Sequence, residues 1–410
     1  MPPLPLPPPD PLAQALVVLG GGDPALVCRG GGTSAPWRYA LVPSARNPRA
    51  LLPLDASAAC LRTALAPYAE GAAAPAMRVA ARMLQALSRL GLAAPLLRHR
   101  LTVGPALPGS ALPLHDYLAD VLGTRRFVTA LRLAPDRPNG KPVVQVSDPQ
   151  GRPLAYAKFG WEPLTRRLIA AEAAMLATLA PAVAGSPVTV PAVLAAGPWN
   201  GLQALVVAPL PAGGRAPARL ADIPPEALSA LVCALPPRQL RLGQSPFWHR
   251  ERRRIGTLAD HLSAAGAATL TDAARVVEER WGDEPLVFGL GHGDWIPPNM
   301  RVQRGGRLVV WDWERAAGDA PLGRDLLQFL QFDQHRRDAR PGPRGTRRLQ
   351  AEAAATLAAQ GLEPAHAPLL AILSLIETVL WFAEAREADR AQTEDAGYLA
   401  LLRHAVDTVA

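Results

Sequence analysis

Two oxygen-bearing side chains near residue 300 have a spacing that could bind a divalent cation. The segment NMRVQRGGRLVVWD runs from Asn299 to Asp312, and its Gly305-Gly306 pair predicts a two-residue hairpin turn. Such a turn pairs Arg304 with Arg307. The register then places Asn299 directly opposite Asp312, with their Cβ atoms about 4.5–5.5 Å apart. An amide oxygen and a carboxylate at this separation suit Mg²⁺, which prefers oxygen ligands.

Asp294 lies five residues before Asn299 and could face the same cation. Phosphoryl transfer needs a carboxylate that orients or deprotonates the attacking group, and Asp294 is the candidate for this base. We expect Asn299 and Asp312 to bind the metal. Taken singly, each residue has an ordinary alternative, such as a turn cap for Asn299 or a surface ion pair for Asp312. We expect His292 to brace the loop through a hydrogen bond rather than to act as the base.

Lys158 and Glu172 form a second candidate pair. Strand alternation places Leu154, Tyr156 and Lys158 on one face, and Glu172 interrupts the apolar stripe of a helix expected over residues 163–179. An unpaired buried carboxylate costs several kcal/mol, so pairing with Lys158 would satisfy Glu172 and would aim the ammonium at a fixed anion such as phosphate. In the alternative, Glu172 lies at the edge of the stripe and reaches solvent.

The secondary structure expected around these residues changes in type along the chain. We expect a Pro-rich tail, strands near WRYALVP and RALLPL and helices near residues 57–66 and 76–90, which together make an N-terminal α/β extension over residues 1–120. An antiparallel meander of RFVTALRL, PVVQV and PLAYAKF, the helix from Pro163, and strands in PAVLAAGPW and LQALVVAPL make a sheet-containing lobe over 121–210. Helical spacing dominates the lobe expected over 211–410.

Composition excludes several other classes of protein. The net charge of +8 comes from 43 basic and 35 acidic residues that are scattered, so we expect no nucleic-acid partner. Three distant cysteines indicate neither a disulfide framework nor a zinc site. The longest apolar stretch, near Leu369 to Phe382, carries Glu377, so we expect no membrane partner. These features are typical of a cytoplasmic protein.

The motif GLGHGDWIPPNM followed by VVWDWE resembles the catalytic and metal-binding motifs of the aminoglycoside phosphotransferase and choline kinase family. The resemblance extends from about residue 125 to the C-terminus. It implies an α+β, bilobal protein-kinase-like fold with a small antiparallel-sheet N-lobe, a larger mostly helical C-lobe and ATP between them. The extension over residues 1–120 lies outside the resemblance, and its sequence specifies no partner.

The same resemblance implies roles for individual residues. Asp294 would be the catalytic base, and Asn299 and Asp312 would hold Mg²⁺. Lys158 would bind the α and β phosphates of ATP, with Glu172 as its ion-pair partner. Asp325 would be a structural brace or helix cap. The backbone that would bind the adenine edge at a hinge between the lobes belongs to Val207, Ala208 and Leu210.

The acceptor is less well defined than the nucleotide site. Only about a dozen residues separate Asp312 from Asp325, and no Ala-Pro-Glu segment follows, so we expect a small-molecule hydroxyl acceptor rather than a folded protein. An aminoglycoside, a sugar and a choline-like alcohol all remain open. Acidic residues near the C-terminus could line a pocket for a polycation or could form the polar face of a helix: Glu384, Glu387, Asp389, Glu394 and Asp395.

One departure from the family supports a different function. A Gly-rich loop that cradles phosphate is expected between the first two strands of the meander, but APDRPNGKP over residues 134–142 contains a single glycine. Lys141 or the backbone near Gly140 could contact phosphate instead, or the segment could be an ordinary hairpin turn. The alternative function is therefore a catalytically silent, nucleotide-binding regulatory module.

Overall fold

The computed structural model describes residues 11–29, 37–70, 75–106, 112–133, 140–337, 343–389 and 394–409. The chain divides into two compact units. The sheet unit comprises Met1–Ala173 and Pro191–Pro209, and the helical unit comprises Ala174–Val190 and Leu210–Ala410. This division into a sheet-containing part and a mostly helical part confirms the α+β fold class expected from the sequence.

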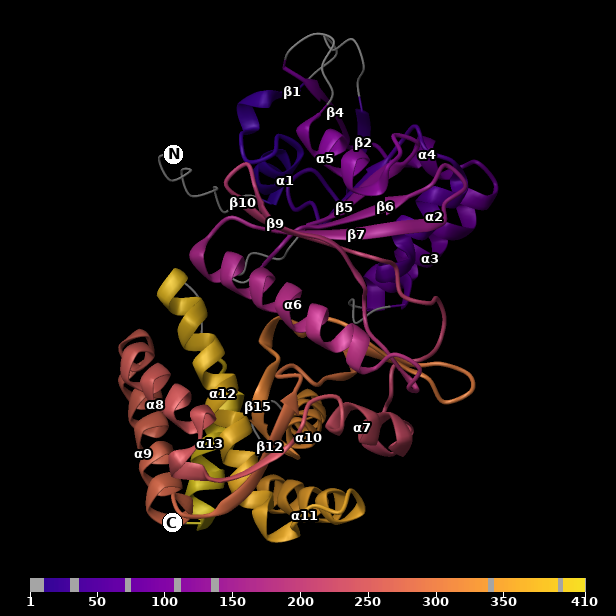
Figure 1. Ribbon diagram of the computed structural model, residues 1–410. Coiled ribbons are helices and arrows are strands. Elements are labelled where there is room, and N and C mark those ends of the chain that lie inside the picture. The colour runs from indigo at the N-terminus through magenta and orange to yellow at the C-terminus, as the bar shows by residue number, and fades with distance from the viewer. Residues whose placement is uncertain are drawn as a thin grey trace. The chain divides into compact units, whose positions relative to one another are not determined.

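The sheet unit is built on a nine-stranded antiparallel sheet with the order β1-β4-β2-β3-β5-β6-β7-β10-β9 (Figure 1). The expected meander is present as three neighbouring strands. The strands are β1 (Val27–Arg29), β2 (Trp37–Val42), β3 (Ala50–Pro53), β4 (Arg100–Pro105), β5 (Val128–Arg132), β6 (Val143–Ser147), β7 (Pro153–Gly160), β9 (Val193–Trp199) and β10 (Leu202–Val207).

Helices cover both faces of this sheet. Strand alternation places Leu51 in the core formed with α1 and α5, while Ala50 and Leu52 pack in the core formed with α2. The helices of the unit are α1 (Pro11–Leu19), α2 (Ala58–Glu70), α3 (Pro75–Arg89), α4 (Ala93–Leu96) and α5 (Pro113–Leu122), with a 3₁₀ turn at Pro24–Leu26. Helix α6 (Pro163–Ala182) begins in this unit with Pro163 at its first position, as predicted.

Residues 1–120 do not form a separate body. They supply β1 to β4, and β3 pairs directly with β5 through Ala50↔Arg132 and Leu51↔Leu131. The boundary expected at residue 120 therefore falls inside one compact unit. Pairing with β3 covers the outer backbone edge of β5, which would otherwise present unsatisfied N–H and C=O groups.

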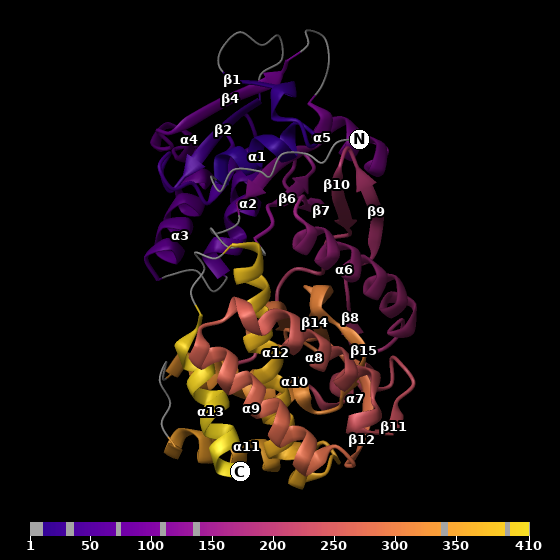
Figure 2. The same ribbon diagram turned by 90° about the vertical axis from the view of Figure 1, so that its left-hand side faces the viewer.

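The helical unit is organised around α12 (Ala367–Ala388), which packs against α8, α9, α10, α11 and α13 (Figure 2). The span Pro364–Ala388 is long and apolar enough to cross a membrane, but 72% of its most apolar window is buried inside the protein. A central position in the core explains this composition. The other helices are α7 (Pro225–Val232), α8 (Pro246–Leu258), α9 (Ala264–Trp281), α10 (Arg324–Arg337), α11 (Pro343–Ala359) and α13 (Ala396–Val409).

Two small three-stranded sheets carry the motifs of the helical unit. One has the order β11-β12-β15 and the other β13-β14-β8. Their strands are β8 (Val188–Thr189), β11 (Arg238–Arg241), β12 (Pro285–Gly291), β13 (Met300–Val302), β14 (Leu308–Val310) and β15 (Ala317–Pro321). The loop that follows β12 and the turn that follows β14 hold the candidate catalytic residues. Cys60 and Cys233 are free thiols.

Candidate functional site

In the sheet unit, Lys158 and Glu172 form the ion pair that strand and helix periodicity predicted. Lys158 Nζ lies 2.8 and 2.7 Å from the two carboxylate oxygens of Glu172. The Glu172 side chain is 3% exposed and the Lys158 side chain 17%. Lys158 sits between Val143 on β6 and Leu205 on β10, so the central position of β7 fixes its backbone. A buried bidentate pair of this kind orients the ammonium.

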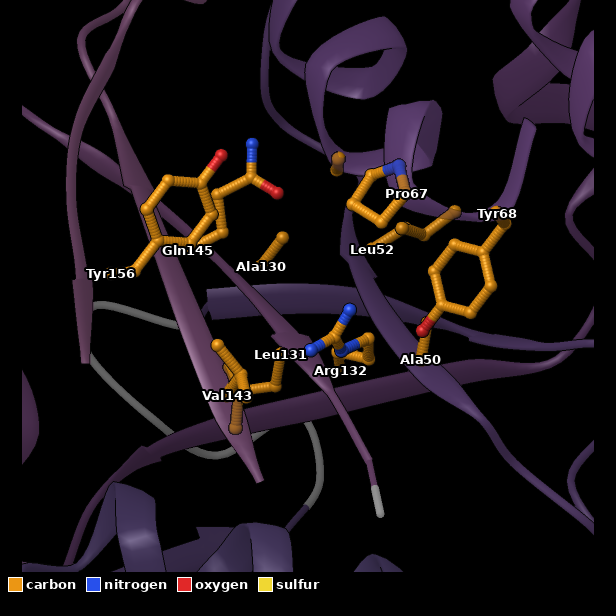
Figure 3. Close-up of a pocket in the computed structure, with 11 residues that line it drawn as sticks. Ala50, Leu52, Pro67, Tyr68, Ala130, Leu131, Arg132, Val143, Gln145 and Tyr156 are labelled. Carbon is orange, nitrogen blue, oxygen red and sulfur yellow. The ribbon is translucent and has the colours of Figure 1, made fainter. Parts of the chain in front are cut away.

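A small cavity lies on the face of the sheet that carries Lys158. Tyr156 and Gln145, which are opposite each other on β7 and β6, line one side, and Pro67 and Tyr68 of α2 line the other (Figure 3). Its volume is about 50 Å³. This is room for about one or two water molecules and is too small for a nucleotide. We interpret the cavity as a packing gap between the sheet and α2.

The predicted hinge is the end of β10. Val207 pairs with Tyr156 and Val193, and the Ala208 N–H donates to the carbonyl oxygen of Ala192 at 2.8 Å. The chain leaves the sheet unit after Pro209. The N–H of Ala208 is therefore used by the sheet.

In the helical unit, Asp294 and Asn299 are in direct contact. Asn299 Nδ2 donates to Asp294 Oδ2 at 2.7 Å and to the Asp294 carbonyl oxygen at 3.0 Å. Both bonds use the amide nitrogen, so Oδ1 is the Asn299 atom whose chemistry suits a cation. Asn299 is 7% exposed and ends a 3₁₀ turn over Pro297–Asn299. One side chain can thus orient the candidate base and contribute a metal ligand.

The hairpin register differs from the predicted one by one residue. Met300 pairs with Val310, and the Trp311 N–H donates to the Asn299 carbonyl oxygen at 3.1 Å, so Asn299 lies opposite Trp311 and not Asp312. The prediction of a two-residue turn is wrong because Gln303 and Arg307 close a three-residue loop. Gly305 and Gly306, with φ of 84° and 78°, both belong to that loop.

Asp312 is held in a backbone conformation that is rare for a residue with a side chain. Its φ of 70° and ψ of 53° are left-handed. Such conformations cost about 1–3 kcal/mol and are concentrated at functional sites. Burial, followed by the negative charge of Asp312, raises the pKa of Asp294 to about 7. The two carboxylates therefore lie within electrostatic reach of each other.

His292 braces the loop over residues 292–299, as predicted; because this loop carries the candidate base, it is here called the catalytic loop. Its Nδ1 accepts a hydrogen bond from the Asp294 N–H at 3.1 Å, and its Nε2 lies 3.1 Å from the Trp311 carbonyl oxygen. Nδ1 is therefore the acceptor, so Nε2 carries the proton and donates it. Burial lowers the pKa of His292, which favours this neutral form. The imidazole ties the loop to the end of the hairpin.

Asp325 is a brace for the same loop, also as predicted. Its Oδ2 accepts from the His292 N–H at 2.6 Å, and its Oδ1 accepts from Arg324 Nη2 at 2.6 Å. Arg324 is 2% exposed and also pairs with Glu377 of α12. Burial opposes the charge of Arg324, but Glu377 and Asp325 outweigh it and raise its pKa. A buried charge cluster thus supports the catalytic loop from behind.

Sequence reasoning missed Arg324, Glu377, Gln328 and Arg315. Gln328 donates to the Gly293 carbonyl oxygen at 2.9 Å and accepts from the Trp295 N–H at 2.6 Å. It follows Asp325 by three residues, so helical spacing could have indicated it. Gly293 has a φ of 81°, and a Cβ there would lie 2.1 Å from the Arg315 carbonyl oxygen. No local pattern reveals this close approach.

The segment expected to replace the phosphate-binding loop is residues 134–142. Of these, residues 134–139 lie outside the part of the chain that the structure describes, and the Pro-rich tail over residues 1–10 does too. The candidate groups in the described part are therefore the Lys158–Glu172 pair in the sheet unit and Asp294, Asn299 and Asp312 in the helical unit.

Neither a protein-family model nor a curated protein matches the sequence. Among solved structures, the chain is similar to a thermostable mutant of the aminoglycoside phosphotransferase APH(4)-Ia in its apo form. The sequence identity is 15%, the TM-score is 0.47, and the match covers 72% of this chain and 99% of that one.

Two further solved structures have a similar extent of match. A putative fructosamine-3-kinase from Haemophilus somnus has 15% identity and a TM-score of 0.42, covering 72% of this chain and 96% of its own. An ethanolamine kinase from Plasmodium vivax has 12% identity and a TM-score of 0.44, covering 72% and 84%.

Proposed function

We propose that the chain transfers the γ-phosphoryl group of ATP to a hydroxyl group of a small molecule. The observation that carries this proposal is the arrangement around Asp294. A half-buried carboxylate accepts a hydrogen bond from Asn299 on its own loop, lies within electrostatic reach of the strained Asp312, and is fixed through its N–H by His292. This arrangement supplies a base and hard oxygen ligands in one place.

The donor set suits Mg²⁺. Asp312 and Asn299 offer a carboxylate and an amide oxygen, and the raised pKa of Asp294 reflects burial and negative charge that a cation would offset. When bound, Mg²⁺ would supply positive charge to the phosphate oxygens of ATP. Asp312 and Asn299 are the residues that would hold it.

Asp294 is the proposed base. A pKa of about 7 means that the carboxylate is substantially ionised at neutral pH and can accept the proton of an acceptor hydroxyl. The Asn299 amide, which donates to Oδ2, would keep the carboxylate in one orientation. In the sheet unit, Lys158 would bind the α and β phosphates, with Glu172 holding the ammonium. The carbonyl of Ala208 and the N–H of Leu210 would contact adenine.

For the acceptor, we favour an uncharged alcohol such as a sugar over a polycationic aminoglycoside. Glu384 is 8% exposed and already binds Arg254 Nη2 at 3.1 Å and Arg315 Nη1 at 3.0 Å. Asp395 accepts from the Gly397 N–H at 2.9 Å and lies 3.2 Å from His335 Nε2. Carboxylates committed to such partners offer little to an additional ammonium group.

One aromatic residue near the proposed base is compatible with a sugar acceptor. The rings of Tyr398 and His335 are stacked with centroids 4.4 Å apart. Burial, then the negative charges of Asp395 and Asp294, raise the pKa of Tyr398, so this phenol lies within electrostatic reach of the proposed base. An aromatic ring with a hydroxyl suits the apolar face and the polar edge of a sugar. A tyrosine ring can also contact the quaternary ammonium of a choline-like acceptor through a cation–π interaction, so Tyr398 favours neither of these two acceptors.

The alternative, a catalytically silent nucleotide-binding module, is motivated by the single glycine in residues 134–142. It shares the nucleotide site with the main proposal and differs only in turnover. The intact set of Lys158, Asp294, Asn299 and Asp312 favours catalysis.

Isothermal titration of ATP, with and without Mg²⁺, tests the nucleotide site. The wild type should bind ATP in a magnesium-dependent manner, and Asp312→Ala should lose that dependence. Asp407→Ala removes an exposed carboxylate of α13 and should bind as the wild type does. An absence of binding to the wild type would refute both functions. Magnesium-dependent binding without ADP formation in a screen of sugars, polyols, choline and aminoglycosides would support the silent module.

A further inference from the structure

We propose that a cavity behind the catalytic loop of the helical unit binds a small, uncharged, largely apolar molecule that carries a hydrogen-bond acceptor. The cavity has a volume of about 260 Å³. Its walls come from α7, the end of β12, the start of α10 and the connection after α11, and they include Leu228, Val232, Leu290, Leu322, Leu326 and Leu362. This is a pocket of the apolar kind that holds small ligands.

The polar feature that indicates a ligand is the indole of Trp295. This side chain lines the cavity and is 2% exposed. Its Nε1–H has no hydrogen-bond partner in the described part of the chain. A buried donor without a partner lowers stability, and a ligand that supplies an acceptor would recover part of this cost. By contrast, Nε1 of Trp313, which also lines the cavity, donates to the Val310 carbonyl oxygen at 3.3 Å.

The two titratable groups on the buried side of the cavity, Asp325 and His292, are already used by the protein. Asp325 binds Arg324 and the catalytic loop, and both ring nitrogens of His292 are engaged. The cavity therefore offers no unsatisfied charge to attract an ion, which is why the ligand is expected to be uncharged. Its exposed rim includes Ser229 and Cys233 of the α7 region, whereas His292 and Trp295 on the floor are almost completely buried.

The position of the cavity gives its occupant access to the catalytic loop. His292 and Trp295 belong to the loop, and His292 accepts the hydrogen bond from the Asp294 N–H. The site is distinct from the proposed nucleotide and metal groups, because none of Lys158, Asp294, Asn299 and Asp312 lines it. A ligand there would regulate the loop from its inner side.

The test uses coumarin, a neutral bicyclic compound with a carbonyl acceptor, and follows the indole N–H resonances of ¹⁵N-labelled full-length protein. Trp295→Phe identifies the Trp295 resonance. Coumarin should shift this resonance with a saturable isotherm. The resonance of Trp248, whose Nε1 lies 3.3 Å from Glu278 and outside the cavity, should not move.

A matched pair of variants locates the site. Ser229→Phe fills the rim from an exposed position and should weaken coumarin binding about tenfold or more, whereas Glu226→Phe on the same helix lies outside the lining and should not. Coumarin should also slow the alkylation of Cys233, measured by mass spectrometry of that peptide. No saturable shift of Trp295, or equal binding by both variants, would overturn the proposal. Since the readout is binding, these outcomes are independent of phosphoryl transfer.

Discussion

Lys158 and Glu172 are positioned by a strand and a helix, whereas Asp294 is positioned by a loop whose shape depends on side chains from other elements. The positions of Lys158 and Glu172 follow from the side-chain alternation of β7 and from the apolar stripe of α6. The loop needs His292, Asp325 and Gln328, and Asp325 in turn needs Arg324. The lysine should therefore tolerate distant substitutions, while the geometry of Asp294 should depend on the buried cluster behind it.

Replacing the proposed base should have the largest effect, and this effect should be on turnover. Asp294→Asn should lower turnover about a thousandfold, equivalent to about 4 kcal/mol in the activation barrier, because the amide cannot accept the hydroxyl proton. The affinity for Mg-ATP should change little. Turnover is measured with the acceptor found in the screen, and affinity by calorimetry. The exposed Asp407→Asn is the control, and near-wild-type turnover of Asp294→Asn would refute the assignment of the base.

Removing Arg324 from the buried charge cluster behind the loop should lower the stability of the protein. Arg324→Met leaves Asp325 and Glu377 as buried carboxylates without their arginine, and should destabilise the protein by about 3 kcal/mol. Urea unfolding measures the loss. Arg275→Met removes an exposed arginine that pairs only within α9, and should cost less than about 0.5 kcal/mol. Equal effects of the two variants would show that the cluster does not stabilise the loop.

Acid should weaken the sheet unit through His115. Burial lowers the pKa of this imidazole to about 4, below its ordinary value of 6.5, so the unfolded chain binds more protons between these values. Stability should therefore fall as pH falls through this window, by about 2–3 kcal/mol between pH 7.5 and 4.5. His115→Phe removes this contribution. Urea midpoints at the two pH values should differ less in the variant than in the wild type.

Breaking the Lys158–Glu172 ion pair should have a milder effect, on the affinity for Mg-ATP. Lys158→Met should weaken Mg-ATP binding about tenfold, since one phosphate contact is lost, equivalent to about 1.4 kcal/mol. Glu172→Gln should have part of this effect by releasing the ammonium. In a double-mutant cycle the two changes should be non-additive by about 0.5–3 kcal/mol, because the residues are in contact. Simple additivity in calorimetric affinities would mean that Glu172 does not orient Lys158.

The smallest expected effect concerns the hairpin turn. Gly306 has a φ of 78°, and a Cβ there would make only an ordinary contact with a Pro224 side-chain carbon at 3.9 Å, so Gly306→Ala should cost about 1 kcal/mol from backbone strain. Gly256 of α8 has open space but is helical, and Gly256→Ala should stabilise the protein slightly. Opposite signs in urea unfolding would support the three-residue loop.

Much of the sheet unit could be predicted because its signals are local. Alternation indicated β5, β6, β7, β9 and β10, and together with the apolar stripe of α6 it predicted the Lys158–Glu172 pair. The extent of the sheet could not be predicted, since the pairing of β3 with β5 joins segments that are about 80 residues apart. The domain boundary expected at residue 120 had no local sequence feature to contradict it.

The chemical identity and order of the candidate groups could be predicted from local sequence: Asp294, Asn299 and Asp312 lie within 19 residues, and a lysine and a glutamate lie on adjacent elements. Tertiary structure alone decided how the loop is held. A one-residue change in hairpin register, the left-handed backbone of Asp312 and the buried Arg324–Glu377 pair all depend on contacts between distant segments. Periodicity records which face of an element is buried, but it carries no information about which distant side chain meets it there.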